Sequence, residues 1–371
     1  MINPFYEKLA KLAVNYSIKV KEGDRVFILG STLAEELFRA LYIEIIKAGG
    51  YPLLLPAIEG QEDLFFRYAS EKQLTYVDDI RKQIHRDFDS MIAISGKYNT
   101  KDLSLVDPKI LAKRFSSAEY KELWKLWYDR AAREEARWVI IPFPCNSHAQ
   151  DANMDLFSYS NFIEKALFLD KENPIQEWQK IEKDQDKYVN YLNKVEKIQI
   201  LGEDTDLTLS TKGRTWENDC GRFNLPDGEV ATSPVENAVN GHIRFTYPGI
   251  FQGKEIENIY LEFKDGNVVN YSADKGQELL EEILKIENAQ RLGEFAIGTN
   301  YGITQFTKNM LFDEKIGGTI HCALGAGFKE LGSKNDSAIH WDILKDMKSP
   351  NSKILADGKV IYEEGNWKIQ N

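Results

Sequence analysis

The first half of the chain alternates between short apolar runs and longer segments with helical periodicity. Apolar residues recur at helical spacing from Leu37 to Ala48, after a capping box at Thr32 to Glu35, and Gly49-Gly50 ends that helix. The apolar or β-branched runs, which are typical of buried strands, span residues 25–29, 51–55, 90–95 and 138–142. Strands that alternate with helices predict a mostly parallel sheet covered on both faces.

Residues 151–170 and 174–194 predict two further helices. The pattern changes after them, because residues 198–263 are rich in β-branched residues and in Gly and Asp turns, as antiparallel hairpins are. Residues 273–289 predict one amphipathic helix. We therefore expect two domains: an α/β N-terminal domain over residues 1–195, and an α+β C-terminal domain with antiparallel strands over residues 196–371.

Composition and charge exclude several classes of protein. The chain is 43% hydrophobic with 19 Phe, 17 Tyr and 7 Trp, which is far from the composition of disordered chains. A net charge of −11 argues against a nucleic-acid-binding surface. Three widely spaced cysteines fit a reducing cytoplasm, and we find neither a signal-peptide pattern nor an apolar stretch of the roughly 20 residues that cross a bilayer. We expect a cytoplasmic protein without a membrane partner.

The first expected strand is followed by Gly30-Ser31-Thr32, a position where nucleotide-binding proteins carry phosphate-binding loops. Neither a GxGxxG nor a GxxxxGK[ST] motif is present. The sequence therefore argues against a nucleotide-dependent enzyme.

Five residues of the second domain have the chemistry of metal ligands. His340 and Asp342 are two residues apart, so in a strand both side chains point to the same side. His321 lies in a run of small and apolar residues, and Glu229 and Glu294 each follow a glycine, which leaves space for a ligand or an ion. Taken singly, each carboxylate is equally explained as solvated and each histidine as hydrogen-bonded in a core. Together, two imidazoles and three carboxylates favour a metal site.

Several longer motifs resemble the thermophilic metalloprotease family, of the aminopeptidase S and aminopeptidase T type. They are NLPDGEVATSP at 224–234, VENAVNG at 235–241, LFDEKIGGTIH at 311–321 and SAIHWD at 337–342, with shorter matches at 47–52 and 204–208. The similarity extends over nearly the whole chain, and several long motifs in the same order are a specific signal.

The resemblance implies a metal-dependent aminopeptidase that cleaves peptides with a free N-terminus. Matched by position, the family's metal ligands are Glu229, Glu294, His321, His340 and Asp342. It also implies two divalent ions per chain, for which zinc or cobalt suits the mixed nitrogen and oxygen ligands. Glu294 is then expected to bridge the ions or to accept a proton from the attacking water. A homodimer that encloses the site is expected as well.

The sequence departs from the family pattern at Phe328, where the family has a tyrosine seven residues after its first histidine ligand. A tyrosine hydroxyl there could donate a hydrogen bond to an oxyanion, and phenylalanine cannot. Either another donor such as Tyr301 or Tyr247 replaces it, or the position is mainly a wall of the pocket, or activity is low. The alternative function is a catalytically impaired or repurposed protein that binds peptides or amines. Glu236 is a further candidate, as an acceptor that orients a histidine.

Overall fold

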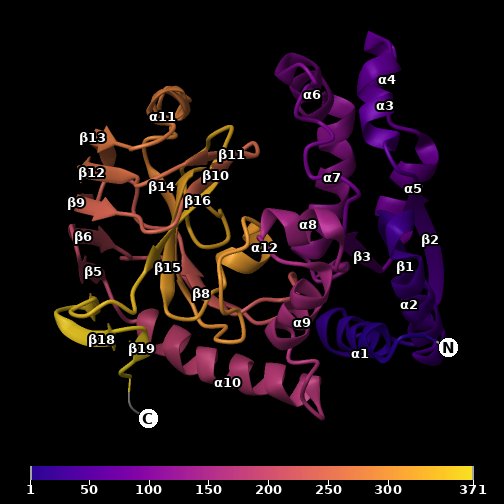
Figure 1. The fold of residues 1–371 in the computed structure, drawn as a ribbon, viewed down its shortest axis with the longest axis horizontal. Coiled ribbons are helices and arrows are strands. Elements are labelled where there is room, and N and C mark those ends of the chain that lie inside the picture. The colour runs from indigo at the N-terminus through magenta and orange to yellow at the C-terminus, as the bar shows by residue number, and fades with distance from the viewer. Residues whose placement is uncertain (1, 370–371) are drawn as a thin grey trace. The chain divides into compact units, whose positions relative to one another are not determined.

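The computed structural model describes residues 2–369, which form two compact units (Figure 1). Unit 1 comprises Met1–Ile175 and Gly221–Pro226, and unit 2 comprises Gln176–Cys220 and Asp227–Asn371. The helix α10 (Pro174–Leu192) falls mostly in unit 2. The domain boundary expected after residue 195 stays a prediction.

Unit 1 contains a four-stranded parallel sheet with the strand order β2-β1-β3-β4. Its strands are β1 (Arg25–Ser31), β2 (Tyr51–Ala57), β3 (Ser90–Ser95) and β4 (Arg137–Pro142), which confirms the strands and the parallel sheet predicted from the apolar runs. The centre of β1, Val26-Phe27-Ile28, is completely buried, as expected for a strand covered on both faces.

The α-helices of unit 1 precede, connect and follow these strands. They are α1 (Pro4–Leu12), α2 (Glu35–Lys47), α3 (Gln61–Tyr68), α4 (Glu71–Thr75), α5 (Asp79–Asp87), α6 (Pro108–Phe115), α7 (Ala118–Ala131), α8 (Asn146–Asp151) and α9 (Leu156–Ala166). The capping box predicted at Thr32 is wrong, because Ser31 still has extended backbone and its hydroxyl accepts the hydrogen bond from the Leu33 backbone N–H. A short 3₁₀ turn (Thr32–Ala34) then leads into α2.

A cavity of about 1000 Å³ lies in unit 1, and its lining includes Ser31 at the end of β1 and Ser95 at the end of β3. Carboxyl ends of parallel strands are a common place for ligands. None of the residues predicted from the sequence to form a site lines this cavity. The chemistry of the second unit, rather than the cavity, identifies the candidate site.

Unit 2 is built from antiparallel sheets, as predicted. The eight-stranded sheet has the order β13-β12-β9-β6-β5-β17-β18-β19, and the five-stranded sheet has the order β16-β15-β14-β8-β7. The strands of the first are β5 (Lys197–Gly202), β6 (Thr205–Ser210), β9 (Val239–Arg244), β12 (Tyr260–Lys264), β13 (Asn267–Ser272), β17 (Lys353–Ala356), β18 (Lys359–Glu363) and β19 (Asn366–Trp367). Those of the second are β7 (Trp216–Asp219), β8 (Glu229–Thr232), β14 (Leu292–Gly298), β15 (Thr319–Gly325) and β16 (His340–Asp346).

Both sheets contribute to one hydrophobic core, which includes Ile198 and Leu207 from the first sheet and Phe295 and Ile320 from the second. A small pair, β10 (Gly249–Phe251) and β11 (Lys254–Ile256), and two short helices, α11 (Gln277–Leu284) and α12 (Met310–Asp313), complete the unit. The helix expected over 273–289 is shorter at both ends: Lys275 pairs with Glu257 in an isolated bridge and Gly276, with φ +80°, precedes the first helical residue, and the helix ends at Leu284.

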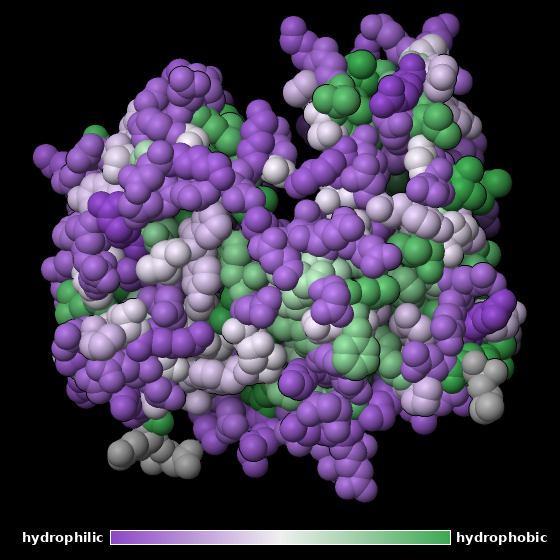
Figure 2. All heavy atoms as spheres, viewed as in Figure 1, coloured by the Kyte–Doolittle hydropathy of each residue, from purple (hydrophilic) through white to green (hydrophobic). Residues whose placement is uncertain are grey.

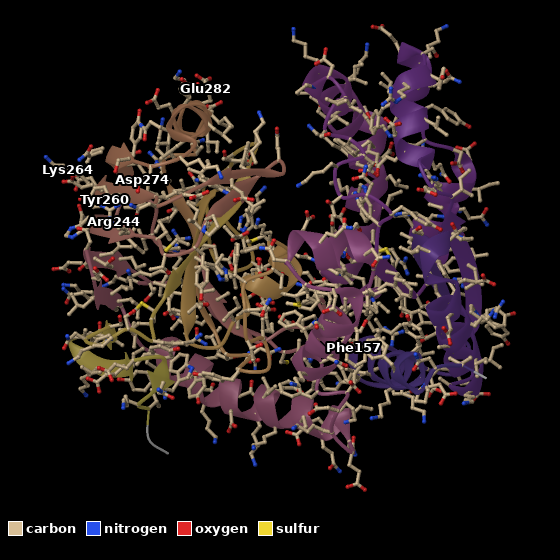
Figure 3. All side chains as sticks on the ribbon, in the orientation of Figure 1. Phe157, Arg244, Tyr260, Lys264, Asp274 and Glu282 are labelled. Carbon is tan, nitrogen blue, oxygen red and sulfur yellow. The ribbon has the colours of Figure 1, made fainter. Side chains whose placement is uncertain are left out.

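Hydrophilic side chains cover most of the face drawn in Figure 2, in keeping with a chain of which 28% of the residues are charged. In unit 2, Arg244 of β9 lies over the ring of Tyr260 of β12, 5.1 Å from its centroid (Figure 3). None of the helices in the described part of the chain is long and apolar enough to cross a membrane.

Candidate metal centre

The five-stranded sheet has one face in the core and one face that carries polar chemistry. On β15, Ile320, Cys322 and Leu324 belong to the hydrophobic core, so His321 and Ala323 point to the opposite face. The same alternation on β16 places Trp341 and Ile343 in the core and His340 and Asp342 on the other face. The expectation that His340 and Asp342 share one side of a strand is confirmed.

A β-bulge turns Glu294 to this face. Leu292 is in the core, and regular alternation would send the side chain two residues later to the core as well. The ladder between β14 and β15 shifts register between Leu292 and Glu294, after which Phe295 occupies the core and Glu294 faces the histidines. Gly293 makes the bulge possible, because a Cβ atom there would lie 2.2 Å from the Ala326 carbonyl oxygen.

Three buried alanines leave space between the polar side chains. Ala323 lies between Glu294 on one neighbouring strand and Asp342 on the other. Ala296 is paired with both His321 and Ala231. Since their side chains are single methyl groups, the longer polar side chains of adjacent strands can meet above them.

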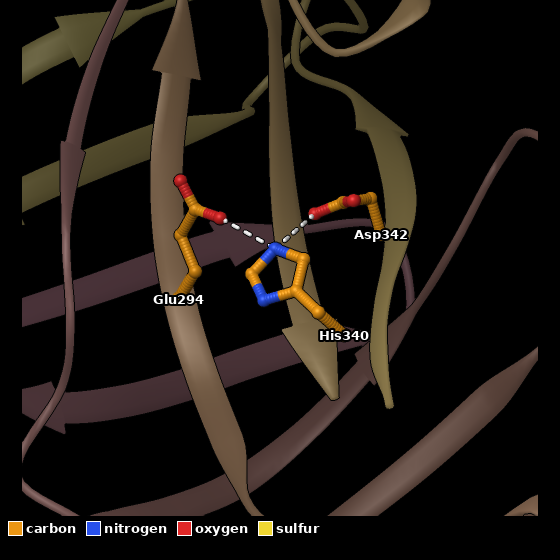
Figure 4. Close-up of side chains that lie close together, drawn as sticks. All are labelled: Glu294, His340 and Asp342. Atoms are coloured by element: carbon orange, nitrogen blue, oxygen red, sulfur yellow. Dashed lines mark ion pairs between the residues drawn. The ribbon is translucent and has the colours of Figure 1, made fainter. Parts of the chain in front are cut away.

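The five residues predicted as ligands come together on this face. His340 Nε2 lies 3.0 Å from Glu294 Oε2 and 3.4 Å from Asp342 Oδ1, and Figure 4 shows the imidazole between the two carboxylates. His321 Nε2 lies 3.6 Å from Glu294 Oε1, 3.7 Å from Glu229 Oε2 and 3.9 Å from Asp342 Oδ1. The His321 side chain is 1% exposed and the His340 side chain 30%, so the cluster opens on the His340 side.

Backbone carbonyls orient both imidazoles. His340 Nδ1 lies 2.7 Å from the Ala326 oxygen and His321 Nδ1 lies 3.2 Å from the Glu314 oxygen, so the Nδ1–H donates and Nε2 faces the carboxylates. This is how metal-binding histidines are commonly held. The idea that Glu236 orients a histidine is wrong, because its carboxylate accepts hydrogen bonds from Arg214 at 2.5 Å and from the Lys334 backbone at 2.6 Å.

Two charged residues beside the cluster escaped the sequence analysis. Glu314 forms a group with His321 and Asp342 in which one ligand atom from each lies within 4.8 Å of the others, and Glu294, His340 and Asp342 form a second such group. Lys315 is 1% exposed, donates to Glu229 Oε1 at 2.6 Å and is paired with Glu314. Both lie in the motif that ends at His321, but a lysine beside a glutamate gives no local signal that it is buried, and buried lysines are rare unless they are paired.

The cluster strongly perturbs the pKa values of its members in the metal-free protein. Burial lowers the pKa of His321, but Glu294, Glu229 and Asp342 outweigh it and raise the pKa to about 10. The pKa of His340 rises to about 12 for the same reason, with Asp342 and Glu294 as its partners. Burial raises the pKa of Glu229 to about 8 against the influence of Lys315, whereas hydrogen bonds to the two histidines bring the pKa of Glu294 below its usual value despite burial. Protons thus compete for the positions that a cation would take.

The hydrogen-bond pattern fits a metal centre. Among the residues that the structure describes, Glu229 Oε2 and Asp342 Oδ1 are buried and have no hydrogen-bond partner. They have only longer ion pairs to imidazole nitrogens, from Glu229 to His321 and from Asp342 to both histidines. A buried carboxylate oxygen without a hydrogen bond is unfavourable, and coordination to a cation is one way to satisfy it. The donors present, imidazole nitrogen and carboxylate oxygen, are those that zinc and cobalt accept.

Phe328 lies at the open side of the cluster. The residue is 41% exposed, and the centroid of its ring is 5.2 Å from that of the His340 imidazole. The contacts of Tyr301 and Tyr247, the two candidates for a replacement donor, do not involve the cluster. The Tyr301 hydroxyl donates to the Gly365 carbonyl at 2.7 Å, and the Tyr247 ring stacks on Phe306.

The sequence of the chain matches a known protein family over almost its full length. The family model described as thermophilic metalloprotease (M29) matches residues 3–367. The chain belongs to the thermophilic metalloprotease family. This confirms the resemblance found in the motifs and makes the protein a metalloprotease, which hydrolyses peptide bonds with the help of divalent metal.

Relatives in this family align over nearly the full chain. Aminopeptidase 2 of Geobacillus stearothermophilus is 27% identical, with 98% of this chain and 98% of the relative covered. Aminopeptidase AmpS of Bacillus subtilis is 25% identical, with 99% and 100% covered. Among solved structures, wild-type AmpT from Thermus thermophilus superposes with a TM-score of 0.84 and 22% identity over 98% of this chain and 99% of that one. The fold class predicted from the sequence is confirmed.

Proposed function

We propose that the protein is a metal-dependent aminopeptidase that removes N-terminal residues from peptides. Its family and the aminopeptidase relatives support this function. The observation that carries the site assignment is the position of Glu294, whose Oε1 faces His321 and whose Oε2 faces His340. A carboxylate that offers one oxygen to each of two imidazoles has the arrangement of a ligand shared between two ions.

The residues present divide into two sets of donors. Glu294 Oε2, His340 and Asp342 would hold one ion, and Glu294 Oε1, His321 and Glu229 Oε2 would hold the other, with Asp342 near both. Glu314 supports the second set as a further oxygen donor. When bound, two divalent ions supply Lewis acidity and an activated water. We propose zinc or cobalt in these positions.

The side chains themselves account for the remaining steps. Glu294 lies between both imidazoles. It would either bridge the ions through both oxygens or keep one oxygen free to take a proton from the attacking water. The exposed edge of His340 and the Phe328 ring form the side from which a peptide can approach. We propose that the free α-amino group of the substrate would be anchored by one of the ions or by an acidic side chain of the cluster, which would select peptide N-termini.

The assembly and compartment are proposed on more general grounds. The family resemblance supports a homodimer that encloses the site. Three buried cysteines, all free thiols, are consistent with a reducing cytoplasm.

The test compares peptides that differ only at the N-terminus. Metal-loaded protein should release the first residue of a free peptide and leave its N-acetylated form intact, because acetylation removes the charged amine. A chelator should abolish the activity, and added zinc or cobalt should restore it. Equal cleavage of both peptides would replace the aminopeptidase function with endopeptidase or amidase activity. Metal binding without cleavage of any peptide would favour the repurposed binding protein.

A further inference from the structure

Lys315 is an unusual neighbour for a metal centre. It follows α12 and is 1% exposed, so its ammonium has almost no access to water. It donates to Glu229 Oε1 at 2.6 Å and is paired with Glu314. A buried ammonium is costly to keep in a fold unless carboxylates surround it. Its position beside two carboxylates of the cluster calls for a role beyond the stability of the fold.

The two carboxylate oxygens of Glu229 make different contacts. Oε1 is bound by Lys315, whereas Oε2 is buried, lies 3.7 Å from His321 Nε2 and accepts no hydrogen bond from any residue that the structure describes. The backbone of Glu229 is fixed as well, because Gln185 donates to its carbonyl oxygen at 2.7 Å. The carboxylate therefore cannot rotate to present both oxygens to one point without breaking the ion pair with Lys315.

We propose that Lys315 is a positioning residue that makes Glu229 a one-oxygen ligand. This proposal rests on the proposed function, since it assumes that the cluster holds divalent ions. By retaining Oε1, Lys315 leaves only Oε2 for the ion near His321. Fewer protein oxygens around that ion leave a coordination position open for water or substrate, which separates catalytic from purely structural metal sites. Through its pair with Glu314, Lys315 restricts a second carboxylate beside the same ion in the same way.

Cobalt provides a spectroscopic test that does not depend on activity. Six-coordinate cobalt(II) absorbs visible light much more weakly than four- or five-coordinate cobalt(II), so the visible absorption per bound ion reports the coordination number. In Lys315→Met, Glu229 is free to bind through both oxygens, and we expect a loss of visible absorption per bound cobalt. The matched control is Lys345→Met, because Lys345 is 2% exposed and its ammonium donates to the backbone carbonyls of Glu203 and Arg244, which are not part of the cluster. Lys345→Met should be destabilised about as much as Lys315→Met and should keep the wild-type spectrum.

A second pair of variants serves if Lys315→Met does not fold. Glu229→Gln preserves shape but has only one oxygen, and Lys315 should claim that oxygen and turn the amide nitrogen toward the ion. Its cobalt affinity should therefore be as low as that of Glu229→Ala. If Lys315 does not hold the side chain, the amide oxygen can turn to the ion, and Glu229→Gln should bind cobalt clearly more tightly than Glu229→Ala.

The outcomes separate this proposal from the proposed function. Wild-type protein that binds no cobalt would refute the metal centre itself. Wild-type protein that binds cobalt, with an unchanged spectrum in Lys315→Met or a clear advantage of Glu229→Gln over Glu229→Ala, would refute only the positioning role. Lys315 would then be a structural ion-pair partner, like any other buried lysine.

Discussion

Metal binding should release protons, because both imidazoles of the metal-free cluster are protonated. The pKa is raised to about 10 for His321 and about 12 for His340, so both are cationic at pH 7.5. A metal ligand must be neutral imidazole, so binding of the ions displaces both protons. Glu229, with a pKa raised to about 8, is partly protonated at this pH and adds a further fraction of a released proton. We expect at least two protons released per chain when both positions fill.

The sign and size of the pH dependence follow. Since the raised histidine pKa values favour the metal-free form at low pH, the overall affinity for two ions should fall as pH falls. Each released proton changes the binding free energy by about 1.4 kcal/mol per pH unit, so two protons give about 2.7 kcal/mol, or roughly a hundredfold, per unit.

Titration calorimetry of zinc into metal-free protein measures the number directly. The same titration is run at pH 7.5 in buffers with different ionisation enthalpies, and the slope of observed heat against ionisation enthalpy gives the protons released. Titration of zinc into a chelator in each buffer is the control for the metal's own chemistry. A slope below one proton per chain would show that the imidazoles are not protonated partners of the carboxylates, and the electrostatic account of the cluster would fail.

Three other predictions test separate parts of the account. Replacement of His340 or Asp342 by Ala should remove at least one ion per chain by elemental analysis, and wild-type metal content in both variants would show that they are not ligands. If the missing hydroxyl limits the rate, Phe328→Tyr should raise kcat by up to about 10²-fold with little change in KM; a folded, metal-loaded variant with unchanged kcat would make Phe328 a wall of the pocket. Burial raises the pKa of Asp313 to about 8, so its carboxyl increasingly destabilises the fold as pH rises from about 4 to 8. The free energy of unfolding of Asp313→Asn should therefore fall less than that of wild type over that range. Urea unfolding at several pH values, with a chelator present, measures it. If the two proteins lose stability in parallel with pH, the raised pKa is contradicted.

The parallel sheet of unit 1 was predictable because its strands are short, apolar and separated by helical repeats. The run from Ser90 to Ser95 was placed to the residue, since turns and polar segments bound it on both sides. The start of α2 was misplaced, because Ser31 and Thr32 are both good caps and only the backbone conformation distinguishes them. The short helix α11 also could not be separated by periodicity alone from the non-helical residues 273–276 and 285–289 on either side of it.

The members of the cluster and their common site were predictable from their chemistry and motifs, but the backbone geometry that brings them together was not. The spacing of His340 and Asp342 places both on one face of a strand. Glu294 would face the core by alternation with Leu292, and only the bulge at Gly293 turns it to the site. Such a register shift depends on pairing with β15, a long-range contact that a local pattern does not contain.

Lys315 and Glu314 illustrate the same limit. A neighbouring pair of opposite charges is usually solvated, and nothing in the local sequence distinguishes this one. Its burial follows from the packing of the turn after α12 behind Glu229, a residue far away in the sequence that lies 2.6 Å from the ammonium. Contacts between distant segments thus decide which charged residues belong to the site.

The most direct test of the metal centre is a crystal structure of cobalt- or zinc-loaded protein with anomalous scattering measured at the metal absorption edge. We expect two peaks per chain, one among Glu294, His340 and Asp342 and one among Glu294, His321 and Glu229, with the Glu294 carboxylate between them. No peak at the cluster, or ions bound only elsewhere on the chain, would contradict the assignment of these residues as the metal centre of the enzyme.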